Sequence, residues 1–254
     1  MPYLEVFAAG SVYSFFLVFL RTGMAIMLLP GYGEQLIPAR IRLIIGLALS
    51  VAIMPVVSHA APAPPPPPAD MVWQFAMEFS VGAFIGTVAR IIFSALHVAG
   101  QIIGQSVGLA TFFPTIGAGF EGGSAVTSGL TMAGLVVIFL TDLHLVMIEA
   151  IVRSYAIFPL AQSIDWSELS KLAAKAVGRG FLLGVQFSAP FVVISFLFNL
   201  GLGLTNRMMA ALPVFFIGMP LLLMGGMLLL VATLPAILMR QTDELDHWIR
   251  LIAF

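Results

Sequence analysis

The sequence predicts an all-α protein that crosses a membrane several times, and two observations support this. Of its 254 residues, 60% are hydrophobic and 9% are charged, whereas soluble domains average about 45–50% apolar and about 25% charged residues. A helix crosses a bilayer with about 20 mostly apolar residues. The chain has six such segments, at 12–30, 41–57, 73–98, 130–151, 178–204 and 214–239.

The first hydrophobic segment is predicted to stay in the mature protein. The start of the chain, Met-Pro-Tyr-Leu-Glu, lacks the basic stretch of a cleavable signal peptide.

Between the second and third segments lies a proline run at 58–70, which favours an extended, solvated conformation. We interpret this run as a spacer.

Two further stretches have amphipathic helical patterns. Asp165 and Glu168 indicate a helix start of the capping-box type, and apolar residues continue on one face as far as Val177. We expect a short helix there, lying on the membrane surface. The C-terminal tail also carries apolar residues at helical spacing, including Leu245 and Trp248, and could lie on lipid or on a partner.

Several charged residues fall inside the apolar segments. Arg21, Arg90, Asp142 and Glu149 would each cost about 2.5–3.5 kcal/mol at a lipid-facing helix centre. We therefore expect them to face protein or water, much of it supplied by other subunits. The full set predicted to be buried polar or subunit-contact residues is Arg21, Arg90, Asp142, His144, Glu149, Asn199, Asn206 and Arg207.

Membrane orientation is not decided by the basic residues. The positive-inside rule applied to 153–179, which holds four of them, places that connection and both termini in the cytoplasm. Arg40, Arg42 and Arg207 favour the opposite orientation.

Glycines recur at the spacing that lets membrane helices approach closely. The predicted helix-packing residues are Gly82 and Gly86, then Gly100, Gly104 and Gly108, and finally Gly180 and Gly184. The partner helix could belong to this chain or to another subunit.

No sequence motif predicts an enzyme, a cofactor or a metal site. GQSVG at 104–108 matches the GxSxG pattern of serine hydrolases, with Ser106 as nucleophile and His97 or His144 as base, but that motif requires a strand-to-helix turn. A metal site from Asp142, His144 and Glu149 fails because positions 142 and 144 point about 200° apart on a helix. The net charge of −1 argues against nucleic acid as a partner, and the chain has no cysteine.

A long motif near the C-terminus carries a family resemblance. NLGLGLTNRMMAALPVFFIGMPL, at 199–221, resembles the signature of the FliR family, the R-type subunit of the flagellar type III export gate. Further similarities lie at Arg21, PGYG at 30–33, IPAR at 37–40, GQIIGQSVGLA at 100–110, His144-Leu145 and Pro159.

The resemblance implies partners and a location. One R-type subunit would join P-type and Q-type subunits in the bacterial inner membrane at the flagellar basal body, with a FlhB-type switch protein around its base. Residues 1–177 would be similar to a P-type subunit and 178–254 to a Q-type hairpin with an amphipathic tail. The channel would pass unfolded flagellar proteins, and membrane lipid would surround part of it.

The resemblance also gives the glycine-rich loop at 111–129 a role, as the plug of the gate. Bulky side chains would exclude water, and glycines would let the backbone move aside because they reach positive φ without strain. The predicted plug residues are Phe112, Phe113, Pro114, Ile116, Gly117, Gly119, Phe120, Gly122 and Gly123. Two alternatives are a plain linker for the loop and an autonomous transporter or small-solute channel for the protein. Many transporters have internal repeats, and we find none here.

Overall fold

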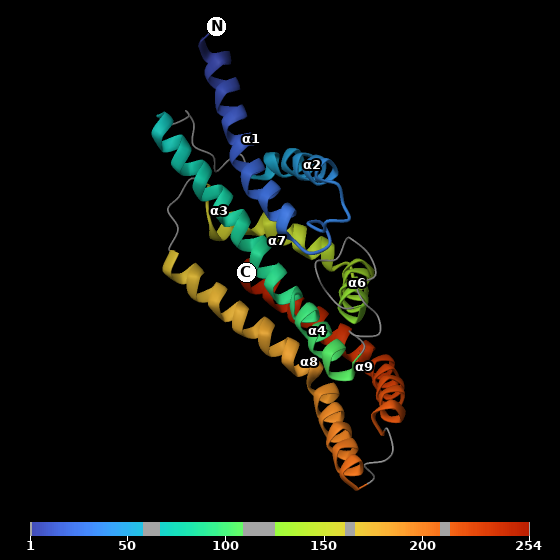
Figure 1. The fold of residues 1–254 in the computed structure, drawn as a ribbon. Helices are drawn as coiled ribbons and strands as arrows, with labels where there is room; N and C mark the ends of the chain where they lie inside the picture. The colour runs from blue at the N-terminus through green and yellow to red at the C-terminus, as the bar shows by residue number, and fades with distance from the viewer. Residues whose placement is uncertain (1, 58–66, 109–124, 161–165, 209–213, 254) are drawn as a thin grey trace. The chain divides into compact units, whose positions relative to one another are not determined.

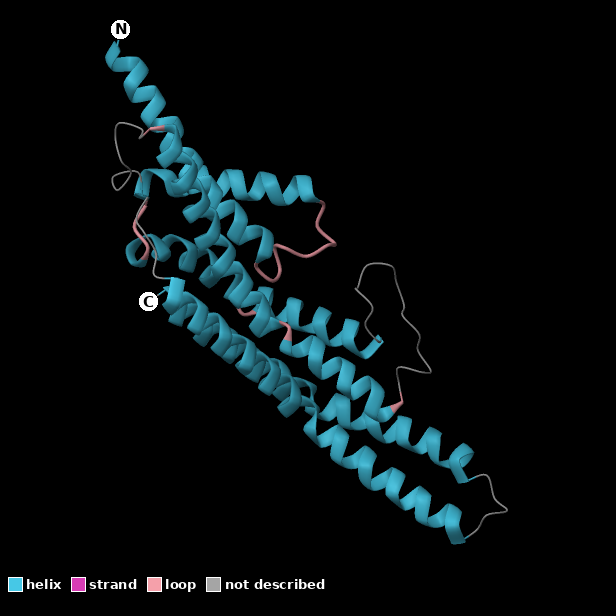
Figure 2. Ribbon diagram, turned by 60° about the vertical axis from the view of Figure 1, so that its left-hand side comes forward, coloured by secondary structure: helices cyan, strands magenta, loops and turns pink. Residues whose placement is uncertain are grey.

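The computed structural model describes residues 2–57, 67–108, 125–160, 166–208 and 214–253, and in these ranges the chain is helical, with no strand (Figure 2). Its helices are α1 (Pro2–Leu28), α2 (Ala39–Val57), α3 (Pro68–Phe93), α4 (Ala95–Val107), α6 (Ala125–Leu140), α7 (Leu143–Ile157), α8 (Trp166–Met208) and α9 (Val214–Ala253) (Figure 1). The predicted all-α fold class is confirmed.

The predicted number of long apolar segments is confirmed as well. Among the described residues, five helices are long and apolar enough to cross a membrane, and a sixth span results if the bent pair α6 and α7 counts as one. The fourth predicted segment, 130–151, is therefore not one straight helix. Its break lies at Asp142, which adopts a left-handed conformation with φ of 56°.

The amphipathic stretch before the fifth segment is not a separate surface helix. It forms the first turns of α8, which continues for 43 residues. Leu169, Ala176 and Leu183 are all buried and are spaced by seven residues, so one apolar face passes through the expected boundary without a phase change. The sixth segment and the C-terminal tail likewise form one helix, the 40-residue α9.

The described chain divides into two compact units. Unit 1 comprises Met1–Ile92, Ile138–Val177 and Leu245–Phe254, and unit 2 comprises Phe93–Val137 and Gly178–Glu244. The core of unit 1 gathers side chains from α1, α2 and α7, namely Tyr13, Leu17, Val18, Ile53, Val57, Tyr155 and, just after α7, Leu160. Helices α1 and α2 approach closely, because a Cβ atom at Gly46 would lie 3.2 Å from the Gly23 Cα atom.

Unit 2 is arranged around α4, which packs against α6, α8 and α9. A Cβ atom at Gly100 of α4 would lie 2.5 Å from the Cα atom of Thr127 on α6. One at Gly184 of α8 would lie 2.7 Å from the Cβ atom of Val98 on α4, and one at Gly226 of α9 would collide with the Val107 side chain. Small residues on the neighbouring helices thus set how closely they approach α4.

Candidate functional site

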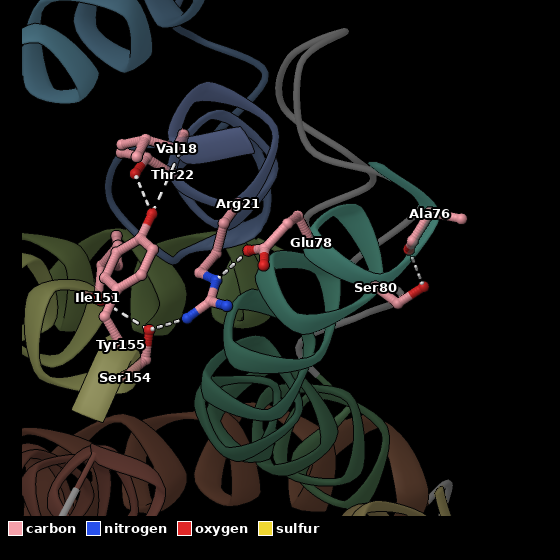
Figure 3. A network of polar contacts seen from close by, with 9 residues as sticks. All are labelled: Val18, Arg21, Thr22, Ala76, Glu78, Ser80, Ile151, Ser154 and Tyr155. Atoms are coloured by element: carbon pink, nitrogen blue, oxygen red, sulfur yellow. Dashed lines mark hydrogen bonds and ion pairs between the residues drawn. The ribbon is translucent and has the colours of Figure 1, made fainter. Parts of the chain in front are cut away.

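A buried ion pair lies in unit 1, where α1, α3 and α7 meet (Figure 3). Arg21 Nε donates a hydrogen bond of 2.6 Å to Glu78 Oε2, and the two side chains are 1% and 2% exposed. A second guanidinium nitrogen, Arg21 Nη1, lies 3.4 Å from the Ser154 hydroxyl. The guanidinium carbon also lies 4.1 Å from the centre of the Tyr155 ring, a cation–π distance. Arg21 is thus satisfied inside the chain.

Glycines on α3 allow this pair to form. Gly82 lies one turn after Glu78, and a Cβ atom there would collide with the Arg21 backbone carbonyl. A Cβ atom at Gly86 would lie 2.9 Å from the Ala25 carbonyl oxygen, also on α1. The Gly82/Gly86 motif therefore packs α3 against α1 of the same chain and brings the two charges within contact.

The Tyr155 hydroxyl extends the network toward α1. It lies 3.4 Å from the Thr22 hydroxyl and 3.4 Å from the Val18 carbonyl oxygen (Figure 3). The network therefore ties α7 to α1 by more than apolar contact.

Arg90 has a more open environment. Its Nη2 atom lies 4.0 Å from Glu34 Oε2, its Nη1 atom donates to the Gly33 carbonyl at 3.4 Å, and its side chain is 42% exposed. Arg90 thus contacts the turn that follows α1 and is not a buried charge within the chain.

The predicted polar residues around α7 have different environments. Asp142 is the exposed N-cap residue of α7, although its side chain makes no capping hydrogen bond. Glu149 is also exposed and accepts a hydrogen bond of 2.9 Å from Arg153 Nε, one turn later. Neither carboxylate lies in the interior of the chain.

His144 is a packing residue at the start of α7. Its ring centre lies 5.1 Å from that of Phe139, and its backbone carbonyl accepts a hydrogen bond of 3.4 Å from the Tyr32 hydroxyl. Burial raises the pKa of the Tyr32 hydroxyl. The His144 Nδ1 atom is buried and has no hydrogen-bond partner among the described residues.

The remaining polar residues of the prediction, Asn199, Asn206 and Arg207, lie exposed on the second half of α8. The Asn199 amide donates to the Ser195 carbonyl at 2.8 Å, four residues back on the same helix. Arg21 is therefore the one member of the predicted set that the chain itself buries completely.

The three glycines predicted to pack helices at 100–108 have two different roles. Gly100 packs against α6, and Gly104 is buried. Gly108, in contrast, is the C-cap of α4 with φ of 80°, and a Cβ atom there would meet no described atom within 4 Å. Its role is to end the helix in the left-handed conformation that glycine adopts without strain. On α8, Gly180 is buried and Gly184 packs against α4.

The sequence pattern did not predict the roles of Gly134 and Gly226, which also contact α4. A Cβ atom at Gly134 would collide with the Leu96 side chain, and one at Gly226 with Val107. Neither glycine has a partner at GxxxG spacing in its helix, so the sequence held no signal for them.

The predicted plug residues, from Phe112 to Gly123, lie outside the described residues. The structure describes the two ends of their segment, Gly108 at the end of α4 and Ala125 at the start of α6.

The described residues do not form a catalytic or metal centre of the kinds considered. Ser106 lies in the last turn of α4, not at a strand-to-helix turn, and its carbonyl accepts a hydrogen bond from the Ser195 hydroxyl. His97 is exposed on the same helix. In the described part of the chain, no three His, Cys, Asp or Glu side chains gather as metal ligands would.

These features define a class of protein, a polytopic helical membrane protein with close helix packing and a buried Arg21–Glu78 ion pair. Residues 12–248 match the family described as Bacterial export proteins, family 1. The flagellar biosynthetic protein FliR of Caulobacter vibrioides is 39% identical over 237 residues, covering 93% of this chain and 94% of the relative. FliR of Escherichia coli is 29% identical over 225 residues, covering 88% of this chain and 85% of the relative.

A relative from another secretion system matches more weakly. The Yop proteins translocation protein T of Yersinia pestis is 29% identical over 160 residues, covering 61% of this chain and 60% of the relative. The chain belongs to the FliR family and is a membrane-embedded subunit of a flagellar or type III export apparatus. The alternatives of a transporter, a solute channel or a serine protease gain no support from these relatives.

Proposed function

We propose that this chain is the R-type subunit of an export gate in the bacterial inner membrane, where it contacts P-type and Q-type subunits and a FlhB-type switch protein. Its family membership and its apolar helices support this assignment. In the gate, it would form part of the pore that passes unfolded flagellar proteins, and its loop at 111–129 would close that pore.

The subunit assignment rests mainly on the residues exposed on the second half of α8. Phe196, Leu200 and Leu204 are 65%, 52% and 58% exposed, and the exposed Asn206 and Arg207 follow within the same helix. Lipid would tolerate the apolar residues, but the polar groups of Asn206 and Arg207, in the last turn of α8, need polar partners. A protein partner can satisfy both kinds of side chain.

Two glycines strengthen this interpretation. Cβ atoms at Gly201 and Gly203 would meet no described atom within 4 Å. Small residues with no neighbour on a membrane helix allow another helix to approach closely. This stretch of α8 therefore has the composition of a subunit contact.

We further propose that residues 1–177 are similar to a P-type subunit and that 178–254 are similar to a Q-type hairpin. Helices α8 and α9 supply the two arms of such a hairpin. Residues 93–137 belong to the same compact unit as 178–244. The proposed similarity therefore concerns the contacts that the helices make with partner subunits. It does not imply that 1–177 and 178–254 fold as two separate units.

A cross-linking experiment tests the subunit assignment. The chain has no cysteine, so Leu200→Cys introduces a single thiol on the exposed face of α8. In cells that hold the complete export apparatus, a bifunctional thiol reagent should join this variant to another export component. Leu183→Cys, at a fully buried position of the same helix, is the matched control and should give no adduct.

Mass spectrometry would identify the partner. An adduct with a P-type, Q-type or FlhB-type protein supports the proposal. A chain that purifies as a stable, monodisperse monomer, with Leu200→Cys free of adducts, would argue against it.

A further inference from the structure

A cleft of about 1010 Å³ lies wholly within unit 1. It is lined by α3, the end of α7, the first turns of α8 and the last turns of α9, and it extends to the Arg21–Glu78 pair. The proposed subunit contact on the second half of α8 does not include this cleft.

One part of the cleft wall is apolar. Val81 and Phe84 of α3 line it, together with Ile157 at the end of α7 and Leu251 near the end of α9. Ile157 and Leu251 are among the large apolar side chains that the chain leaves exposed. This wall offers hydrocarbon contact to an apolar ligand.

Two cations line the cleft beside that wall. Lys171 and Lys175 of α8 are four residues apart, so their side chains lie on one face of the helix. Both are exposed, and neither ammonium group forms an ion pair with any described residue. Four arginines of the second half of the chain, in contrast, each have a carboxylate partner: Arg153, Arg179, Arg240 and Arg250.

Among the described residues that line the cleft, the balance of charge is positive. Arg21 and Glu78 neutralise each other, and Glu168 offsets one of the two lysines. One net positive charge therefore remains beside the apolar part of the cleft wall. Basic residues placed this way attract anionic lipid, with about 1 kcal/mol for each lysine near the surface.

We propose that this cleft binds an anionic glycerophospholipid. Its phosphate would lie against Lys171 and Lys175, and an acyl chain would lie along Val81, Phe84 and Leu251. A lipid combines an anionic group and a hydrocarbon chain in one ligand, as the cleft combines cations and apolar wall. A protein helix would need an acidic residue placed at the same edge.

The test uses photoreactive lipids and the full chain in membranes that contain the complete export apparatus. Phosphatidylglycerol and phosphatidylcholine, each with the same photoreactive acyl chain, are supplied in parallel. After illumination, mass spectrometry locates the lipid adducts on this chain. Phosphatidylglycerol should label peptides that contain the cleft residues more strongly than phosphatidylcholine does.

The variants Lys171→Ala and Lys175→Ala should each lower the phosphatidylglycerol labelling of these peptides roughly fivefold, the factor that corresponds to about 1 kcal/mol. Lys171→Arg keeps the charge and should keep most of the labelling. The matched control is Arg40→Ala, which removes an exposed cation of unit 1 outside the cleft. It should label as the wild type does.

Three outcomes would overturn the proposal. They are equal labelling by the two lipids, lysine variants that label as the wild type does, and adducts between cleft residues and another polypeptide in place of lipid. All these variants replace exposed side chains, so we expect the complex to fold and assemble normally. Unchanged amounts of the assembled complex would confirm this.

Discussion

The two compact units share close glycine contacts but differ in their buried polar groups. Unit 1 buries an ion pair, with Arg21 in contact with Glu78, Ser154 and Tyr155. Unit 2 also has close glycine contacts, in which Gly100, Gly184 and Gly226 bring α4 against three neighbours, but its Arg179–Glu244 pair is partly exposed. A buried ion pair is costly when one partner is lost, whereas a close glycine contact is sensitive to a single added methyl group. Loss of one member of the Arg21–Glu78 pair should therefore destabilise unit 1 in a way that has no counterpart among the described residues of unit 2.

The largest expected effect is on the ion pair of unit 1. Arg21→Leu or Glu78→Leu leaves one charge buried without its partner, which costs about 3–5 kcal/mol. We expect each variant to lower the thermal stability and the membrane level of the assembled chain severely.

The double variant Arg21→Leu/Glu78→Leu sharpens the test. Replacing both members of a buried pair by apolar residues is often neutral, so stability should largely return. A double variant no more stable than either single one would show that the pair does not act as a unit.

In unit 2, the next largest effect should come from Gly184→Ala. The added Cβ atom would lie 2.7 Å from Val98 Cβ and 3.1 Å from the Ala95 carbonyl oxygen. Overpacking of this kind costs about 1–3 kcal/mol.

Gly178→Ala is the control in the same helix, because its Cβ atom would meet no described atom within 4 Å. It should be neutral or stabilise by up to about 1 kcal/mol, as alanine favours a helix over glycine. Chemical denaturation of the purified complex measures both variants. Equal stability of the two would contradict the close packing of α8 on α4.

A smaller effect is expected at Asp142, just after the chain passes from unit 2 to unit 1. Its φ of 56° is unfavourable for a β-branched residue, so Asp142→Val should cost about 1–2 kcal/mol. Asp142→Gly should be tolerated, because glycine reaches positive φ without strain. If thermal denaturation found valine and glycine equally stable, this backbone conformation would not be the native one.

The smallest effect is expected at Ser106. Its backbone carbonyl accepts the hydrogen bond from Ser195, and a substitution of its side chain keeps that carbonyl. Ser106→Ala should therefore leave export near the wild-type level in a secretion assay. Labelling of Ser106 by a fluorophosphonate probe would contradict this and point to a reactive serine.

The sequence predicted the helices better than their ends. Composition and segment length were enough for the all-α fold, because the need for apolar spans is strong. The continuity of α8 was missed, although the pattern from Leu169 to Leu183 keeps its phase across the expected boundary and so carried a signal for it. The break at Asp142 was also missed, because an aspartate with positive φ leaves no local periodic signal.

The sequence predicted only part of the candidate site. A charge inside an apolar segment indicated that Arg21 needs a partner, but only the fold shows that the partner is Glu78 of α3. Gly134 and Gly226 could not be predicted, because their contacts join segments distant in sequence. The exposed residues of α8, such as Asn206, would find their partners in other chains.

The proposal that the loop at 111–129 closes the pore is tested most directly by measuring ion leakage through the assembled export apparatus when export is idle. Replacing Phe112, Phe113 and Phe120 by alanine removes three side chains whose burial would contribute roughly 1.5–3 kcal/mol each, so the membrane should leak ions while the complex still assembles. The variant Gly117→Val/Gly119→Val should instead block export without leakage, since β-branched residues resist positive φ. If both sets of variants assembled, exported and retained ions as the wild type does, the segment would be a linker and not a plug.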